Sequence, residues 1–187
     1  NFLKIADDVL IGGAMAYTFL RARGIETGKS LVEEGHVSLA SDLLNLAEGG
    51  GRRIRLPEDH VVARNFEGYG TRVVSIIDTS AGEMGLDIGP RTVRAYNDLI
   101  AVAKTIVWNG PMGVFENPKF AEGTFAIGRA IAASDAFSIV GGGDSAAAVN
   151  QLGLVGQISH VSTGGGAALE FLSGRKLPGV DVLTDKE

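Results

Sequence analysis

The amino-acid sequence predicts an α/β fold, a three-layer sandwich around a mainly parallel, Rossmann-like sheet with a small antiparallel side element. Short β-branched runs alternate with Ala- and Leu-rich stretches of helical length, as expected when helices cover a parallel sheet. Four of these runs end at glycine-rich turns. The 27 glycines among 187 residues are about twice the usual share, and their clustering at turns indicates ordered structure rather than low-complexity sequence.

The first half of the chain is expected to contain two strands, two helices and the side element. In order, these are a strand over 8–11, a helix over 14–23, a helix over 37–48, a strand over 54–56, the antiparallel pair over 61–63 and 72–77, and a long loop over 79–90. The helices are predicted where apolar residues recur at i, i+3 and i+4 spacing. Gly24 suits the C-terminal stop of the first helix, and Pro57 closes the short strand.

The second half continues the alternation of helix and strand. In order, it predicts a helix over 91–103, a strand over 105–108, a helix over 120–133, a strand over 137–140, a helix over 145–152, a strand over 158–162 and a helix over 167–172. Pro90 lies at the expected first position of its helix, where its missing N–H costs no hydrogen bond. The tail from residue 176 onward is polar and carries no element.

Composition excludes several functional classes. The formal net charge of -5 argues against nucleic acid as a main partner. The absence of cysteine excludes a disulfide scaffold, a cysteine nucleophile and a thiolate metal site. No apolar run approaches the ~18 residues that span a bilayer, and no signal peptide opens the chain, so we expect a cytoplasmic protein without a membrane partner. Because the sequence starts with Asn1 rather than Met, we expect a piece of a longer chain or a processed product.

The strongest candidate site is the turn from Gly141 to Ser145. Bare backbone N–H groups at a helix start bind phosphate oxygens, and the carboxylate of Asp144 suits Mg²⁺, directly or through water. The alternative is that Asp144 or Ser145 is only a helix cap, although a cap does not need three preceding glycines. A second helix start of this type, over 162–167, favours a phosphoryl group held from two sides.

A third candidate is the segment over 108–116. Val114 and Phe115 have the character of a wall for a nucleotide base, and Glu116 is placed to accept hydrogen bonds from ribose hydroxyls. The alternative places Phe115 in the core and leaves Glu116 a solvated loop charge. From the residues alone that alternative is favoured.

Two other patterns are weaker. The segment 27–30, Thr-Gly-Lys-Ser, resembles the end of a phosphate-binding P-loop, but Arg23 stands where the pattern needs glycine and a helix replaces the preceding strand. We therefore interpret it as a false match. Residues 141–146 also fit a dinucleotide fingerprint, but the acidic residue expected about 20 positions later is missing, which weakens an NAD-binding interpretation. The three histidines have no metal-ligand spacing, and His160 is expected to be a packed strand residue.

Taken together, these segments resemble the phosphoglycerate kinase family, specifically its C-terminal, nucleotide-binding domain. Five stretches carry the resemblance, over 11–20, 84–90, 107–116, 141–148 and 159–167, with the order and spacing continuing to Leu177-Pro178-Gly179-Val180. The resemblance implies one nucleotide-binding domain over 1–187 and a glycolytic phosphotransferase. The family transfers a phosphoryl group between 1,3-bisphosphoglycerate and ADP with Mg²⁺, giving 3-phosphoglycerate and ATP.

The resemblance also implies roles for individual residues. Carried onto this sequence, the adenine site is lined by Gly12, Gly13 and Gly85, with apolar contact from Val114 and Phe115, and the ribose is bound by Glu116. The phosphates lie near Asn109 and Pro111, and their oxygens are bound by Gly142, Gly143 and Ser145. Mg²⁺ is ligated by Asp144, and the transferring phosphoryl group is bound by the N–H groups of Gly143 and Gly166. This agrees with phosphoryl transfer by positioning and charge stabilisation.

The sequence departs from the family pattern in two respects. Ala14 stands where the family has a third glycine, which adds one methyl group near the base. The lysine-bearing strand segment that precedes this region in the family, and the N-terminal domain that binds phosphoglycerate, are not in this sequence. We therefore expect a monomer that binds ADP or ATP but does not turn over alone. The alternatives are an isolated nucleotide-binding module or, less well supported, an NAD-binding domain.

Overall fold

The computed structural model describes residues 1–162, 164–172 and 174–182. The strands are β1 (Asp8–Leu10), β2 (Arg53–Arg55), β3 (Asp59–Ala63), β4 (Arg72–Ser75), β5 (Met84–Ile88), β6 (Thr105–Asn109), β7 (Phe137–Gly141) and β8 (His160–Ser162). The α-helices are α1 (Gly13–Ala22), α2 (Val37–Gly49), α3 (Pro90–Val102), α4 (Glu122–Ala133), α5 (Gly143–Gln151), α6 (Gly165–Leu172) and α7 (Pro178–Asp181). None of the described helices is long and apolar enough to cross a membrane.

The described strands form three sheets. β1 pairs in parallel with β2, and β6, β7 and β8 form a parallel sheet in that order. The third sheet is antiparallel, with β3 between β4 and β5. The predicted mixed α/β class, the parallel pairing and the small antiparallel element are thus confirmed. The expected single parallel sheet is instead divided, because no described strand hydrogen-bonds to both β1 and β6.

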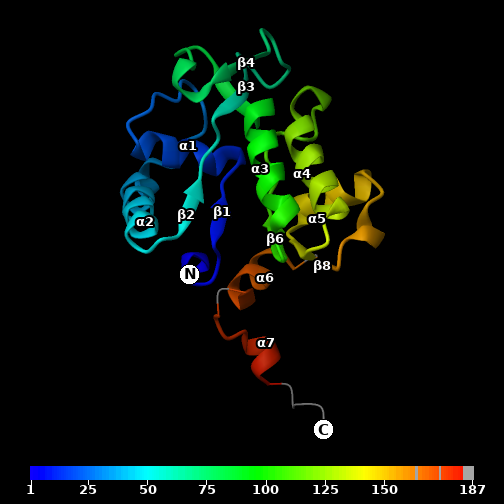
Figure 1. Ribbon diagram of the computed structural model, residues 1–187. Coiled ribbons are helices and arrows are strands. Elements are labelled where there is room, and N and C mark those ends of the chain that lie inside the picture. Colours follow the sequence, from blue (N-terminus) through cyan, green and yellow to red (C-terminus); the bar gives the residue numbers. More distant parts are fainter. Residues whose placement is uncertain (163, 173, 183–187) are drawn as a thin grey trace.

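Helices cover both faces of the β1–β2 sheet (Figure 1). Val9 of β1 packs with Phe19 of α1 and Leu44 of α2 in one apolar cluster. The next residue, Leu10, points to the opposite face and packs against a larger cluster that includes Tyr96 of α3 and Ile127 of α4. This alternation is what a strand between two helical layers requires, and it gives the expected three-layer order around β1.

The larger cluster also holds the β6–β7–β8 sheet. Trp108 of β6, Val140 of β7 and Val149 of α5 are each at most 4% exposed within it. Helices α3 and α4 lie side by side above this core in Figure 1. The two parallel sheets therefore share α3 and α4 as a common layer, although their strands do not pair.

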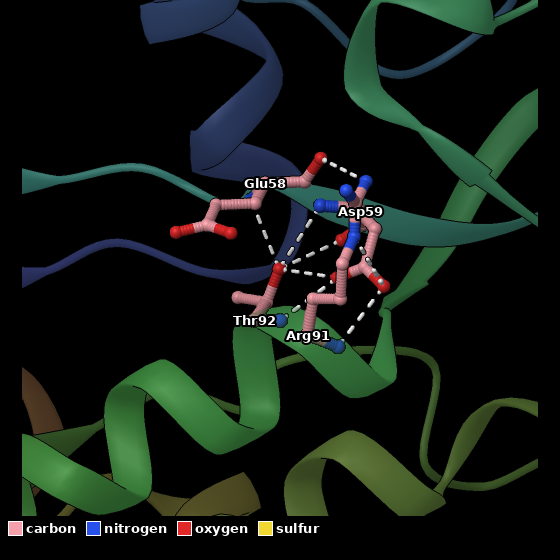
Figure 2. Close-up of polar contacts among 4 residues, drawn as sticks. All are labelled: Glu58, Asp59, Arg91 and Thr92. Carbon is pink, nitrogen blue, oxygen red and sulfur yellow. Dashed lines mark hydrogen bonds and ion pairs between the residues drawn. The ribbon is translucent and has the colours of Figure 1, made fainter.

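Helix α3 is capped by a side chain from another element (Figure 2). Its N-cap residue is Gly89, which has no side chain to accept a hydrogen bond from the first turn. The buried carboxylate of Asp59, on β3, takes this place: Oδ2 accepts from the N–H of Arg91 at 3.0 Å and Oδ1 from the N–H of Thr92 at 2.8 Å. The Thr92 hydroxyl donates to Asp59 Oδ1 at 2.7 Å and accepts from the N–H of Glu58 at 2.9 Å.

Two segments differ from the sequence prediction. The predicted loop over 79–90 contains β5, because Gly85 and Asp87, both unfavourable in strands, obscure the apolar alternation of a strand that is buried at Leu86 and Ile88. The polar tail contains the short helix α7, which begins at a proline. Elsewhere the predicted boundaries agree within two residues.

Candidate functional site

The predicted turns at the ends of β7 and β8 lie next to each other. Gly141 of β7 pairs with Ser162 of β8, so the helices that follow, α5 and α6, start from the same edge of the sheet. The Cβ of an alanine at Gly141 would lie 3.8 Å from the Cβ of Ala168 in α6. The unpaired N–H groups of two helix starts are therefore brought together, which is the arrangement that binds an anion.

These helix starts are open to solvent. A Cβ built at Gly143 or Gly166 would meet no atom within 4 Å, and both residues are exposed. Asp144, in the first turn of α5, is also exposed. The three residues predicted to contact the transferring phosphoryl group and the metal thus remain available to a ligand. Thr163, which follows β8 in the sequence, lies outside the described residues.

The other glycines of the predicted site are closed by the protein itself. At Gly12 the space of a side chain is taken by the Met112 thioether, and at Gly85 by the Tyr17 hydroxyl. At Gly13 a Cβ would lie 2.8 Å from the carbonyl oxygen of Pro111. Gly85 lets β5 pack against α1, and Gly12 and Gly13 let the start of α1 pack against the 110–116 segment. The need for glycine at these positions thus has a structural cause, independent of any ligand.

Asn109 lies close to Gly142, and Ser145 ties the end of β6 to the start of α5. Gly142 caps α5 with a φ of 90°, and a Cβ there would be strained and only 2.5 Å from Asn109 Oδ1. The fully buried hydroxyl of Ser145 accepts a hydrogen bond from the N–H of Gly110 at 2.7 Å. The Ser145 hydroxyl is thus engaged in the scaffold, which leaves its backbone N–H at the helix start.

The segment over 110–116 separates into buried and exposed residues. Phe115 is 7% exposed and packs edge-on against Phe125, with ring centroids 6.5 Å apart. Its side chain is in the core, as the alternative interpretation of the sequence expected. Val114 is half-buried and donates its N–H to the Leu86 carbonyl at 2.8 Å, while Glu116 is exposed.

Residues 27–30, the false P-loop match, serve to hold β5. Ser30 Oγ accepts from the N–H of Gly85 at 2.9 Å, and the N–H of Lys29 donates to the Glu83 carbonyl at 2.7 Å. Hydrogen bonds thus hold this loop against β5 and the residue before it, and no helix starts at Ser30 as a P-loop would require. The structure agrees with the interpretation of this motif as a false match.

Two buried titratable groups lie near β5. Burial lowers the pKa of His60 to about 4; its ring contacts the Tyr17 hydroxyl at 3.2 Å and Thr79 Oγ1 at 2.8 Å. Burial raises the pKa of Asp87 to about 7, although two backbone N–H donors, from Gly123 and Ile88, act in the opposite direction. Sequence reasoning assigned no role to either residue beyond noting that the histidines lack metal-ligand spacing. It also expected His160 to be packed, which is wrong: β8 is an edge strand, and His160 is exposed there.

A metal ion at this site would need most of its ligands from a bound phosphate group and from water. The described residues contain no group of three or more His, Asp or Glu side chains that could hold an ion. One exposed carboxylate, Asp144, beside free backbone N–H groups fits Mg²⁺, which keeps most of its coordination for water and phosphate oxygens.

Comparison with known proteins gives a single family. A family model described as phosphoglycerate kinase matches residues 1–175. The phosphoglycerate kinase of Thermus thermophilus is 59% identical over 185 residues, which cover 98% of this chain and 47% of that protein. The phosphoglycerate kinase of Clostridium novyi is 52% identical over 187 residues, covering 100% of this chain and 47% of that protein.

A solved structure agrees with these matches. Phosphoglycerate kinase from Coxiella burnetii superimposes with a TM-score of 0.93 at 43% identity, covering 98% of this chain and 48% of the other. The chain spans about half the length of the relatives it matches, all of which are named as an enzyme. On the family match and these identities, the chain belongs to the phosphoglycerate kinase family.

Proposed function

We propose that this chain supplies the nucleotide site for phosphoryl transfer between 1,3-bisphosphoglycerate and ADP. The observation that carries the proposal is the pair of adjacent helix starts at α5 and α6, with open glycines at Gly143 and Gly166 and the exposed Asp144 in the first turn of α5. Backbone N–H groups there would bind the terminal phosphates, and Asp144 would hold Mg²⁺. Charge stabilisation of this kind is the main protein contribution to phosphoryl transfer.

The remainder of the nucleotide would extend along the edge formed by α1, β5 and the 110–116 segment. We assign ribose to Glu116, which is exposed, and the apolar contact to Val114. Gly12, Gly13 and Gly85 would contribute as a flat backbone surface, since their side-chain positions are already filled. With Phe115 in the core, this residue supports the wall from behind rather than touching the base.

Substitution of Asp144 tests the proposed metal role. We expect Asp144→Ala to weaken MgADP binding about tenfold or more, as loss of a charge-assisted metal contact does, in a calorimetric titration of the whole chain. The difference from wild type should vanish for ADP in excess chelator. Asp135→Ala is the matched control, because Asp135 is exposed just before β7, at the opposite end of that strand. Equal MgADP affinity of wild type and Asp144→Ala, or a preference for NADH, would contradict the proposal.

Turnover is expected to require more than this chain. In the proposal, phosphoglycerate is held by a basic patch on a second domain, in a monomeric cytoplasmic enzyme, and the chain itself contains only the nucleotide side of the reaction. The purified 187-residue chain should therefore show no 3-phosphoglycerate-dependent consumption of ATP in a coupled assay. Measurable turnover would place both substrate sites on this chain and refute the proposed separation of the two sites between two domains.

A further inference from the structure

The 110–116 segment is held in place by one hydroxyl group. Thr124 lies in the first turn of α4 and is fully buried. Its Oγ1 accepts hydrogen bonds from two consecutive backbone N–H groups, those of Met112 at 3.0 Å and Gly113 at 3.2 Å. A single side-chain atom therefore accepts from one buried and one half-buried donor of a loop that has no regular secondary structure of its own at these positions.

Neighbouring contacts make the same loop a junction between three elements. The Met112 carbonyl accepts from the N–H of Gly13 at 3.0 Å, which ties the loop to the start of α1. The Val114 N–H donates to Leu86 of β5. Each end of the loop segment that Thr124 fixes is thus bonded to an element that lines the proposed nucleotide edge.

Asp87 closes this junction from the side of β5. Its Oδ2 accepts from the N–H of Gly123, adjacent to Thr124, at 2.7 Å. A side chain at Gly113 or at Gly123 would overlap the Asp87 carboxylate. The loop, β5 and the first turn of α4 are consequently packed closely around the Asp87 carboxylate.

We propose that Thr124 is a positioning residue for the nucleotide: by accepting the N–H groups of Met112 and Gly113, it fixes the backbone that presents Pro111, Val114 and Glu116. Because Thr124 is fully buried, it acts only through the loop. The proposal rests on the proposed nucleotide-binding function. Without the hydroxyl, the N–H groups of Met112 and Gly113 lose their acceptor, and the loop shifts toward conformations in which water satisfies them.

Hydrogen exchange of the whole chain tests the loop contact directly. Thr124→Val removes the acceptor at nearly constant volume, and Thr124→Ser retains it. We expect the amides of Met112 and Gly113 to exchange about tenfold faster or more in Thr124→Val, and to remain protected in Thr124→Ser. Thr18→Val is the matched control, since Thr18 is a buried threonine whose hydroxyl accepts from Glu33 outside the loop. Unchanged protection in Thr124→Val would overturn the proposal.

Nucleotide affinity then tests the functional consequence. MgADP should bind Thr124→Val about tenfold more weakly than wild type, while Thr124→Ser and Thr18→Val bind normally. Normal binding by Thr124→Val would overturn the positioning role. Should wild type itself not bind MgADP, the proposed function fails, whereas the exchange data still decide whether Thr124 fixes the loop. If Thr124→Val does not fold, Thr124→Cys, whose thiol is a weak acceptor, is judged by the same criteria.

Discussion

Replacement of Asp59 by alanine is expected to lower the free energy of unfolding by about 3 kcal/mol. The substitution removes the acceptor of two first-turn N–H groups of α3, at Arg91 and Thr92. It also removes one of the two acceptors of the Thr92 hydroxyl, leaving the Asp59 carbonyl oxygen at 2.9 Å. Asp59 is 2% exposed, so water does not readily replace it. The negative charge also faces the positive end of the helix dipole, which adds to the loss. Urea unfolding followed by circular dichroism measures the change.

Two further variants show whether the loss comes from capping. Asp59→Asn keeps one acceptor oxygen but places an amide NH₂ against an N–H donor, so it should lose nearly as much stability as alanine. Glu58→Ala removes the neighbouring carboxylate, whose residue contributes only backbone atoms to this network, and should change stability little. A loss below 1 kcal/mol for Asp59→Ala would show that α3 does not depend on this cap.

The pH dependence of stability is expected to carry a large contribution from His60. Its pKa is lowered by burial from 6.5 to about 4 in the folded chain, so the unfolded chain binds more protons between these values. The free energy of unfolding therefore rises with pH in this window, by about 3 kcal/mol in total, and the contribution is lost as pH falls from 6.5 to 4. Denaturant titrations at a series of pH values measure it.

Asp87 contributes with the opposite sign in the same pH range. Its pKa is raised from 3.8 to about 7, so the folded chain holds its proton longer and stability falls as pH rises between these values. Wild type alone would show only the difference of the two effects. The contribution of His60 is isolated by subtracting the profile of His60→Gln, which retains Asp87 and does not titrate. A difference curve that stays level from pH 4 to 6.5 would contradict the prediction.

The fold was largely predictable because helices and strands leave periodic patterns in the sequence. Each described helix from α1 to α6 follows an apolar pattern or a glycine-rich start that is visible in the residues themselves. The strand β5 was not predictable in this way: Gly85 and Asp87 are required by neighbours that approach from α1 and α4, and they remove the local signal. Tertiary packing here overrides local propensity.

The candidate site was predictable at its exposed positions and less so at its support. Gly143 and Asp144 belong to one glycine-rich turn and Gly166 to another, each visible as a local motif, and the structure leaves all three exposed. Thr124 and Asp59 accept hydrogen bonds from residues 11 to 33 positions away in the sequence, so no short sequence motif indicates their role. The only sequence signal is that Thr124 is a polar residue in the otherwise apolar buried stripe of α4, with Gly123, Ile127 and Ile131.

Glycines whose side-chain space is occupied by neighbouring atoms are of two kinds, which differ in whether a second substitution can compensate for a larger residue at the glycine. Gly85 and Gly12 are filled by the side chains of Tyr17 and Met112, so each pair behaves as one volume shared between two positions. A larger residue at the glycine is compatible with the fold when its partner becomes smaller, and the effects of the two changes are then far from additive. At Gly28, backbone oxygens of Glu83 and Ser80 fill the space, and no second substitution compensates. Homologous chains should therefore vary jointly at 12 with 112 and at 17 with 85, and keep glycine at 28.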